Sequence, residues 1–257
     1  FERTKHLERN INLFGNDFKN LKSIPVIFKY LNELQSKKSL GLKQDFVFYK
    51  THSGLFDIGG NPFTLEENCR GIIYLIRDPR DVCISWSKHS GISLNESIDF
   101  MKNSYSNIYW QEPKTKENVF NKENRPRAFL SSWEKHVISW TSTNWKTPIL
   151  ILRFEDLVYK KSDTIRQIID FFEDNYSFQF KNKENKIINI LKSTEFSKLK
   201  KEEDEKGFIE ATKNQKFFSV GEKNQWIEKL DDKQVNELEL NFGKVMEKFK
   251  YKLKVEF

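Results

Sequence analysis

Arg77 and Ser85 are the polar side chains of this 257-residue chain best placed to bind an anion. Arg77 directly follows the apolar run at residues 72–76, and Ser85 comes eight residues later in a helix that is predicted to stop at Gly91. A guanidinium, a hydroxyl and the free N–H groups of a helix start together suit a phosphate. The alternative is that residues 78–81, Asp-Pro-Arg-Asp, are ordinary helix-start chemistry with a surface ion pair of small energetic value. This stretch alone leaves both readings open.

Lys50 and His52 form a second polar group, after a short apolar run at residues 46–49. Histidine is the side chain best able to exchange protons near neutral pH. The alternative is that His52 ends a strand and bonds to the backbone. Because Lys50 lies two residues earlier, on the same face of the predicted strand, the pattern favours a functional role.

The apolar runs predict the elements that hold these groups. Residues 72–76 and 149–152 are unbroken and rich in β-branched side chains, which is typical of strands covered on both faces in a parallel sheet. A charged turn and a helix follow each run, the second helix spanning residues 162–172. Together with the run at residues 46–49, these make three strands with helices between them, which predict an α/β fold in which ligands bind at the carboxyl ends of the strands.

Cap residues and apolar spacing predict further helices. These are residues 1–45 with an interruption at Ile24-Pro25, a helix after the capping box at residues 93–96, and helices over 129–145, 184–199 and from Asp231. The charge run at residues 200–206 is predicted to be a solvated turn. Residues 106–127 fit an active-site lid or an ordinary surface insertion equally well.

Composition narrows the class of protein. No segment approaches the roughly 20 apolar residues of a membrane helix, so no membrane segment is expected in this chain. Cys69 and Cys83 are too few for a disulfide framework and suit free thiols in the cytoplasm. A net charge of +7 favours anionic ligands, although solvated lysine-rich helices explain it as well. The lysines are dispersed, so no nucleic-acid partner is expected, and the chain is expected to be a monomer or a homodimer.

Taken in order, the segments resemble the sulfotransferases that use 3′-phosphoadenosine 5′-phosphosulfate (PAPS), in the cytosolic and bacterial branch of that family. The joint order of the motifs is far more specific than any one of them. They are KTH at 50–52, IYLIRDPRDVCIS at 73–85 with His89 nearby, SW at 139–140, LRFEDL at 152–157, STEFSKL at 193–199 and FFSVGEKNQW at 217–226.

The resemblance implies a three-layer fold, with a central parallel sheet flanked by helices as in P-loop NTPases. It also implies transfer of a sulfuryl group from PAPS, the co-substrate, to a hydroxyl or amine acceptor. His52 would be the general base and Lys50 would hold the sulfuryl oxygens. Arg77 and Ser85 would grip the donor's 3′-phosphate. No metal is expected, because arginine and lysine can supply the positive charge.

Four further residues match the family's nucleotide contacts. Phe154 would lie beside the adenine, where the family often has a tyrosine. Thr194 and Phe196 would contact the adenine, Phe196 by stacking. Gly221 would belong to a loop whose backbone approaches the 3′-phosphate.

Two departures from the family pattern stand out. Neither the family's PKSGTTW-like phosphate loop nor a GxxxxGK[ST] motif occurs, so residues 1–257 are expected to be a single domain lacking its first strand and that loop. Such a chain would bind PAPS poorly and turn over little. In addition, Ser219 and Val220 replace basic residues of the Gly221 loop. A non-catalytic sulfotransferase-like binding protein and a nucleotide kinase-like P-loop enzyme therefore remain alternatives.

Overall fold

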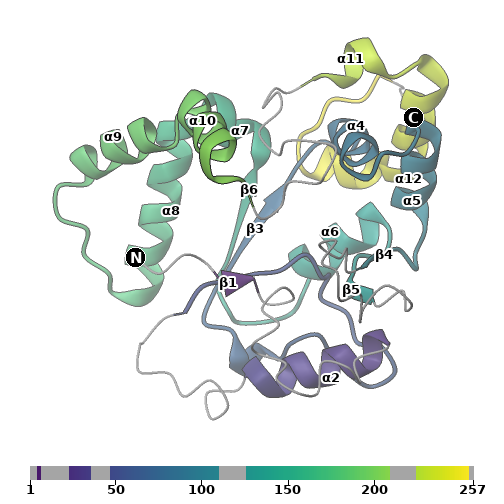
Figure 1. Cartoon of the computed structure of the whole chain (residues 1–257). Coiled ribbons are helices and arrows are strands. Elements are labelled where there is room, and N and C mark those ends of the chain that lie inside the picture. The colour runs from purple at the N-terminus through teal and green to yellow at the C-terminus, as the bar shows by residue number, and fades with distance from the viewer. Residues whose placement is uncertain (1–4, 7–22, 36–46, 110–125, 209–223, 255–257) are drawn as a thin grey trace. The chain divides into compact units, whose positions relative to one another are not determined.

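The computed structural model describes residues 5–6, 23–35, 47–109, 126–208 and 224–254 (Figure 1). The chain divides into two compact units, Phe1–Gly71 with Phe100–Thr147, and Ile72–Asp99 with Pro148–Phe257. In the first unit, β1 (Lys5–His6) pairs in parallel with β2 (Tyr49–Lys50), and β4 (Asn107–Tyr109) pairs antiparallel with β5 (Pro126–Phe129).

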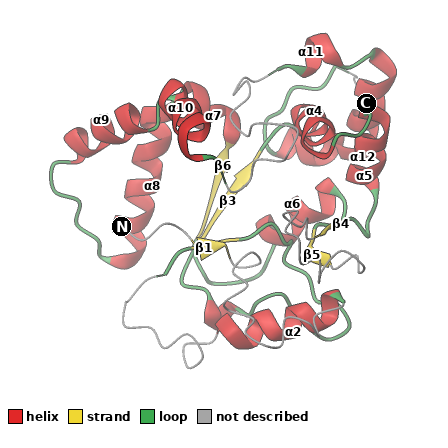
Figure 2. Ribbon diagram, in the orientation of Figure 1, coloured by secondary structure: helices red, strands yellow, loops and turns green. Residues whose placement is uncertain are grey.

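The second unit is built on a parallel pair of strands, β3 (Ile72–Ile76) and β6 (Ile149–Arg153) (Figure 2). The strands are in register from Ile72 opposite Ile149 to Ile76 opposite Arg153. α4 (Pro79–Ser90) follows β3, whereas α7 (Phe154–Tyr159) and α8 (Lys161–Tyr176) follow β6 and pack on it. The predicted α/β class, with a parallel sheet and flanking helices, is confirmed. Because both strands run the same way, their carboxyl ends meet at one edge.

The prediction that residues 72–76 are covered on both faces is wrong for the described residues. Ile76 is buried, but Ile73 and Leu75 are 42% and 49% exposed. Successive side chains of a strand point to opposite faces, so these two residues share the open face. An unbroken apolar run predicts a strand, but it does not say which elements cover each face.

Local cap chemistry sets the bounds of α4 and α12 (Asp232–Lys248), which pack against each other. The Asp78 side chain accepts a hydrogen bond from the Arg80 N–H at the start of α4, and Gly91 ends that helix with a φ of 67°. Asp231 and Gln234 form the capping box of α12. The buried face of α12 comprises Val235, Leu238, Phe242 and Met246 among others.

The remaining helices agree only in part with the prediction from the sequence. α2 (Ile24–Gln35) begins at the predicted interruption, because Pro25 fits a first helical turn. The helix predicted over 129–145 is the shorter α6 (Trp133–Thr141), capped by Ser132, and Phe129 belongs to β5. α5 (Leu94–Lys102) follows the predicted capping box of Ser93 and Glu96.

The helix predicted over 184–199 is two helices, α9 (Lys183–Ser193) and α10 (Phe196–Lys206). The charge run at 200–206 is therefore helical and not a turn. Its charges pair along the helix, Lys201 with Glu205 and Lys206 with Glu202, which supports a solvated helix. The strand predicted at 46–49 shrinks to Tyr49–Lys50, and Phe46 lies outside the described residues.

Two shorter elements complete the description, α11 (Trp226–Lys229) and a 3-10 helix at Glu66–Asn68. The central part of the predicted lid or insertion, residues 110–125, lies outside the described residues. Both cysteines are free thiols, as predicted. Among the described helices, none combines the length and the apolar composition needed to cross a bilayer.

Candidate active site

The stretch after β2, which contains His52, is held by hydrogen bonds to neutral groups. The Ser53 N–H donates to Thr51 Oγ1 over 2.9 Å, so the chain turns as soon as the strand ends. His136 Nε2 lies 3.1 Å from the His52 carbonyl oxygen, and Trp140 Nε1 donates to the Ser53 carbonyl over 3.0 Å. One face of α6 thus supports the backbone on both sides of the His52–Ser53 peptide bond.

Gly54 and Leu55 continue this support. The Gly54 N–H donates to the Phe129 carbonyl over 2.9 Å, and the Leu55 N–H donates to Ser139 Oγ over 3.0 Å. A Cβ atom on Gly54 would lie 2.2 Å from the ring of Phe56, which packs edge-on against Phe129. A side chain at position 54 would therefore require this ring to move.

His136 is a supporting residue that sequence reasoning missed. Burial lowers the pKa of His136, and the contact with the His52 carbonyl opposes this shift only in part. Because a carbonyl can only accept, the contact requires the proton on Nε2. The Ser139-Trp140 motif could have pointed to His136, because residues 136, 139 and 140 lie on one face of a helix.

Lys50 is the last residue of β2, and both Lys50 and His52 are half-buried in the first unit. Lys50 is the predicted cation and His52 the predicted base. The described residues predicted to bind the donor all belong to the second unit.

Arg77 and Phe154 are brought together at the carboxyl edge of the β3–β6 pair. Each is the first residue after its strand, and Ile76 and Arg153 are register partners. The Arg77 guanidinium carbon lies 4.4 Å from the centroid of the Phe154 ring. Arg77, predicted to bind the 3′-phosphate, is thus in contact with Phe154, predicted to lie beside the adenine.

Burial lowers the pKa of Arg77, while the carboxylates of Asp81 and Glu155 counteract this shift. An arginine in such a setting keeps its charge at neutral pH. A cation that is partly desolvated and faces an aromatic ring suits a phosphate dianion.

A buried ionic network holds the turn that follows Arg77. The Arg80 guanidinium donates to Asp78 Oδ2 over 2.7 Å and to Glu239 Oε1 over 2.6 Å. It also stacks on the ring of Trp226, 3.8 Å from the centroid. All three charged residues are almost fully buried, so Asp78 and Glu239 depend on Arg80 for compensation, and Arg80 depends on them.

Glu155 connects this turn to the end of the second strand. Its Oε1 accepts from the Asp78 N–H and its Oε2 accepts from the Tyr251 hydroxyl, both over 3.0 Å. Burial raises the pKa of Tyr251, which keeps the hydroxyl protonated and able to donate.

Asp81 anchors a distant backbone segment to α4. Its Oδ2 accepts from the Asn224 N–H over 2.7 Å, and its Oδ1 accepts from the Trp226 N–H over 3.1 Å. Burial raises the pKa of Asp81, and the two N–H groups and Arg77 oppose that shift. The sequence predicted only that Asp81 suits a first helical turn, so this second role was missed.

The other predicted donor residues lie on helices. Ser85 is exposed on α4. Thr194 is the C-cap of α9, and Phe196 is the first residue of α10 and 40% exposed. Gly221 lies outside the described residues, together with Ser219 and Val220.

Comparison with known proteins identifies the family. A sequence model described as "Sulfotransferase domain" matches residues 6–250. Luciferin sulfotransferase of Photinus pyralis is 28% identical over 129 residues, covering 50% of this chain and 29% of the relative. Sulfotransferase 2A6 of Mus musculus is 32% identical over 104 residues, or 40% of this chain and 32% of the relative. Sulfotransferase 2A1 of Macaca fascicularis is 29% identical over 156 residues, or 56% of this chain and 50% of the relative. The matches thus span half or less of these relatives.

Solved structures support the fold. A mouse sulfotransferase complexed with PAP superposes with a TM-score of 0.55 at 18% identity, over 82% of this chain and 70% of that chain. Retinol dehydratase, in complex with androsterone and inactive cofactor PAP, superposes with a TM-score of 0.54 at 17% identity, over 84% of this chain and 56% of that chain. The predicted sulfotransferase fold is confirmed by these likenesses. Because the family match extends over nearly the whole chain, the chain belongs to the sulfotransferase family.

Proposed function

We propose that the full-length gene product that contains this chain transfers a sulfuryl group from PAPS to a hydroxyl or amine acceptor, with His52 as the general base. The observation that carries the proposal is the contact of Arg77 with Phe154 at the carboxyl edge of parallel strands, in a member of the sulfotransferase family. The two similar structures were solved with PAP, the desulfated donor, which supports PAPS as the co-substrate. The proposal treats residues 1–257 as one sulfotransferase domain.

Arg77 and Ser85 would bind the 3′-phosphate of the donor. The guanidinium offers two parallel N–H groups to one phosphate, and its position over Phe154 limits the orientations that it can take. Phe154, Thr194 and Phe196 would contact the adenine, and the backbone at Gly221 would approach the phosphate. Asp81 would act as a positioning residue, because it ties Asn224, three residues after Gly221, to the helix that carries Ser85.

In the transfer step, the acceptor oxygen forms a bond to sulfur as the bond from sulfur to the donor's bridging oxygen breaks. PAP leaves with the electrons of that bond. His52 takes the acceptor proton, and Lys50 neutralises the sulfuryl oxygens. Such a reaction depends mainly on in-line positioning and on fixed positive charge, so the proposal includes no metal.

Donor binding can be tested by calorimetry with 3′,5′-adenosine bisphosphate on the full-length gene product that contains this chain. Arg77→Ala should weaken the affinity about 10- to 100-fold, because it removes charge-assisted hydrogen bonds. Arg166→Ala is the matched control, since Arg166 lies on the exposed surface of α8 and pairs with Glu184 of α9. The affinity of this variant for the bisphosphate should be unchanged. Absence of binding, or equal affinity for the Arg77 variant, would overturn the donor site.

Catalysis is tested separately with sulfur-labelled PAPS and a panel of hydroxyl and amine acceptors. His52→Ala should lower the transfer rate by about 10²- to 10⁴-fold, the usual contribution of a general base, with bisphosphate affinity unchanged. Retained turnover would refute the role of His52. Nucleotide binding without any sulfated product from the unmodified protein would favour the non-catalytic alternative.

A further inference from the structure

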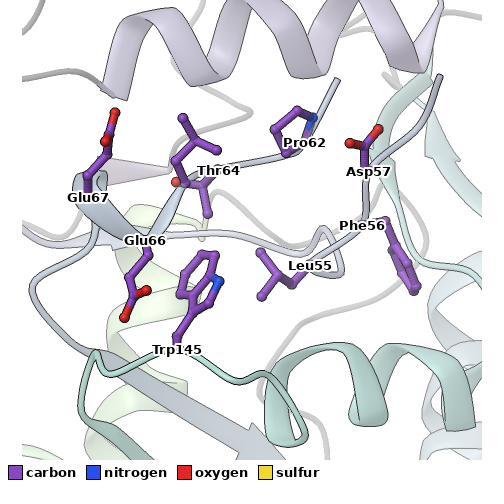
Figure 3. Close-up of a pocket in the computed structure, with 9 residues that line it drawn as sticks. Leu55, Phe56, Asp57, Pro62, Thr64, Glu66, Glu67 and Trp145 are labelled. Carbon is purple, nitrogen blue, oxygen red and sulfur yellow. The ribbon is translucent and has the colours of Figure 1, made fainter. Parts of the chain in front are cut away.

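Two groups of like-charged side chains stand out among the described residues. In the first unit, the carboxylates of Asp57, Glu66 and Glu67 line a cavity (Figure 3). All its lining residues precede β3 or β6 in the chain, whereas Arg77 and Phe154 directly follow these strands. The acidic cavity therefore does not belong to the proposed donor site.

The second group lies in the second unit, where two lysines approach one side-chain oxygen. Lys88 Nζ of α4 lies 3.5 Å from Gln225 Oε1, and Lys229 Nζ of α11 donates to the same oxygen over 2.8 Å. Gln225 immediately precedes α11, which packs against α4. An amide oxygen carries no net charge, so it holds the two ammonium groups without neutralising them.

The surroundings of the two lysines are electropositive. Neither lysine forms an ion pair with a carboxylate within the part of the chain that the structure describes. Burial lowers the pKa of Lys88, and the neighbouring Lys229 and Arg77 lower it further. The Asp81 carboxylate, also on α4, already accepts two backbone N–H groups. Three cations thus share one region, which an anion would stabilise.

The lysine pair lies beside Ser85. Residues 81, 85 and 88 fall on one face of α4, since they are four and three residues apart. At one end of this face Asp81 holds the backbone on both sides of Gln225, and at the other end Lys88 approaches the Gln225 side chain. Ser85 is exposed between them. Its hydroxyl and the Lys88 ammonium are therefore placed to reach the same anion.

We propose that Lys88 and Lys229 bind the 3′-phosphate of the donor, together with Arg77 and Ser85. The identity of the anion rests on the proposed function, whereas the shared approach of the two lysines to Gln225 is a feature of the fold itself. A phosphate dianion would replace the amide oxygen as the acceptor for both ammonium groups.

The two lysines would also determine specificity. Neither Lys88 nor Lys229 is among the residues predicted from the resemblance, so both would be additional contacts to the donor. Because they would contact only the 3′-phosphate, they would make the site prefer a nucleotide that carries this group over one that lacks it.

Calorimetry on the full-length gene product compares 3′,5′-adenosine bisphosphate with adenosine 5′-monophosphate, the latter by displacement of the former. Lys88→Met combined with Lys229→Met should weaken bisphosphate affinity about 10- to 50-fold, because two charge-assisted hydrogen bonds are lost. The affinity for the monophosphate should change less than about 2-fold, since it lacks the 3′-phosphate. Unchanged bisphosphate affinity, or an equal loss for both nucleotides, would overturn the proposal.

The matched control removes the same charge elsewhere in the second unit. Lys186 on α9 and Lys244 on α12 are exposed. Lys186→Met combined with Lys244→Met should leave both affinities unchanged. A loss equal to that of the Lys88 and Lys229 double variant would show an effect of net charge alone and would overturn the proposal.

A purely structural role for the lysines predicts a different result. The two ammonium groups repel each other, so the double variant without nucleotide should have an unchanged or slightly raised urea midpoint. The stabilisation that bisphosphate adds should shrink. Lys88→Arg keeps the charge and should retain bisphosphate affinity within about 3-fold. A lowered midpoint without nucleotide would assign the lysines to the packing of α11 and overturn the proposal.

The outcome for Arg77 separates this proposal from the proposed function. If the bisphosphate binds and its affinity depends on Arg77 but not on the two lysines, the lysine contacts are refuted and the proposed function stands. If the bisphosphate does not bind, the donor site and the lysine contacts are both refuted.

Discussion

The stretch after β2 and the turn after β3 are held in place by opposite means. In the first, the backbone around His52 accepts hydrogen bonds from His136 and Trp140 and donates one to Ser139 Oγ, and all three side chains are neutral. In the second, the turn between Arg77 and Asp81 is held by buried charges, of which Arg80 and Glu239 are the most enclosed. The segment after the strand is thus held by neutral hydrogen-bonding groups in the first unit and by buried ion pairs in the second.

The difference agrees with the chemistry proposed for each stretch. A base that takes up a proton near neutral pH should have neighbours that keep a single charge state, and burial of His136 provides this. A phosphate site needs cations with a permanent charge and a fixed direction, and buried carboxylates hold the turn after Arg77 in place. Substitutions in the ionic turn should therefore cost more stability than substitutions in the neutral stretch.

The largest effect is expected from Arg80→Met. The substitution leaves Asp78 and Glu239 buried without their cation, which should lower the free energy of unfolding by about 3–5 kcal/mol. The measurement is the urea midpoint of the full-length gene product at pH 7. Arg166→Met removes the ion pair with Glu184 on the exposed surface, where water screens the charges, and should barely move the midpoint. Equal shifts for the two variants would show that the buried network does not stabilise the turn.

A smaller effect is expected from Gly54→Ala in the neutral stretch. The new methyl group would collide with the Phe56 ring, which should cost about 1–3 kcal/mol of unfolding free energy. Phe56→Leu removes the colliding ring atoms, so Gly54→Ala should cost less in that background than alone. A double-mutant cycle by urea unfolding measures this coupling. Strictly additive costs would contradict the close approach of residues 54 and 56.

The smallest effect concerns pH and His136. Burial holds the pKa of folded His136 below its unfolded value of about 6.5. The unfolded chain therefore takes up the proton first. The contribution of His136 to stability is present above pH 6.5 and is lost as the pH falls toward the folded pKa, by at most about 1.4 kcal/mol per pH unit.

His136→Gln keeps an N–H donor for the His52 carbonyl and removes the titration. The variant should therefore show a shallower loss of stability below pH 6.5, measured by urea unfolding at several pH values. If the two slopes coincide, His136 is not held neutral by its surroundings.

Local structure was well predicted wherever near neighbours control it. Asp78 caps α4, Gly91 ends it and Asp231 starts α12, because a cap depends on residues within one turn. The charge run at 200–206 was misread for a related reason. Charged residues with no apolar face fit a turn or a solvated helix equally well, and in the structure pairs four residues apart accompany the helix.

The partners of the candidate site could not be predicted in the same way. Asp81 binds the backbone at Asn224, 143 residues away, and Arg80 binds Glu239, 159 residues away. His136 reaches the His52 carbonyl across 84 residues. No periodicity or cap signal connects positions so far apart, although the family motifs identified several of the segments that contain them.

The sequence by itself determined the strands β3 and β6, the starts of α4 and α12, and the residues that stand where strands end. Arg77, Phe154 and His52 occupy those positions because apolar runs stop and polar turns begin there. Only the tertiary structure decided which groups contact these residues and their neighbours. The Phe154 ring lies against Arg77, two carboxylates pair with Arg80, and the imidazole of His136 contacts the His52 carbonyl. The physical reason is that strand and cap signals act between near neighbours, whereas a buried charge or carbonyl needs a partner that only the folded chain brings near.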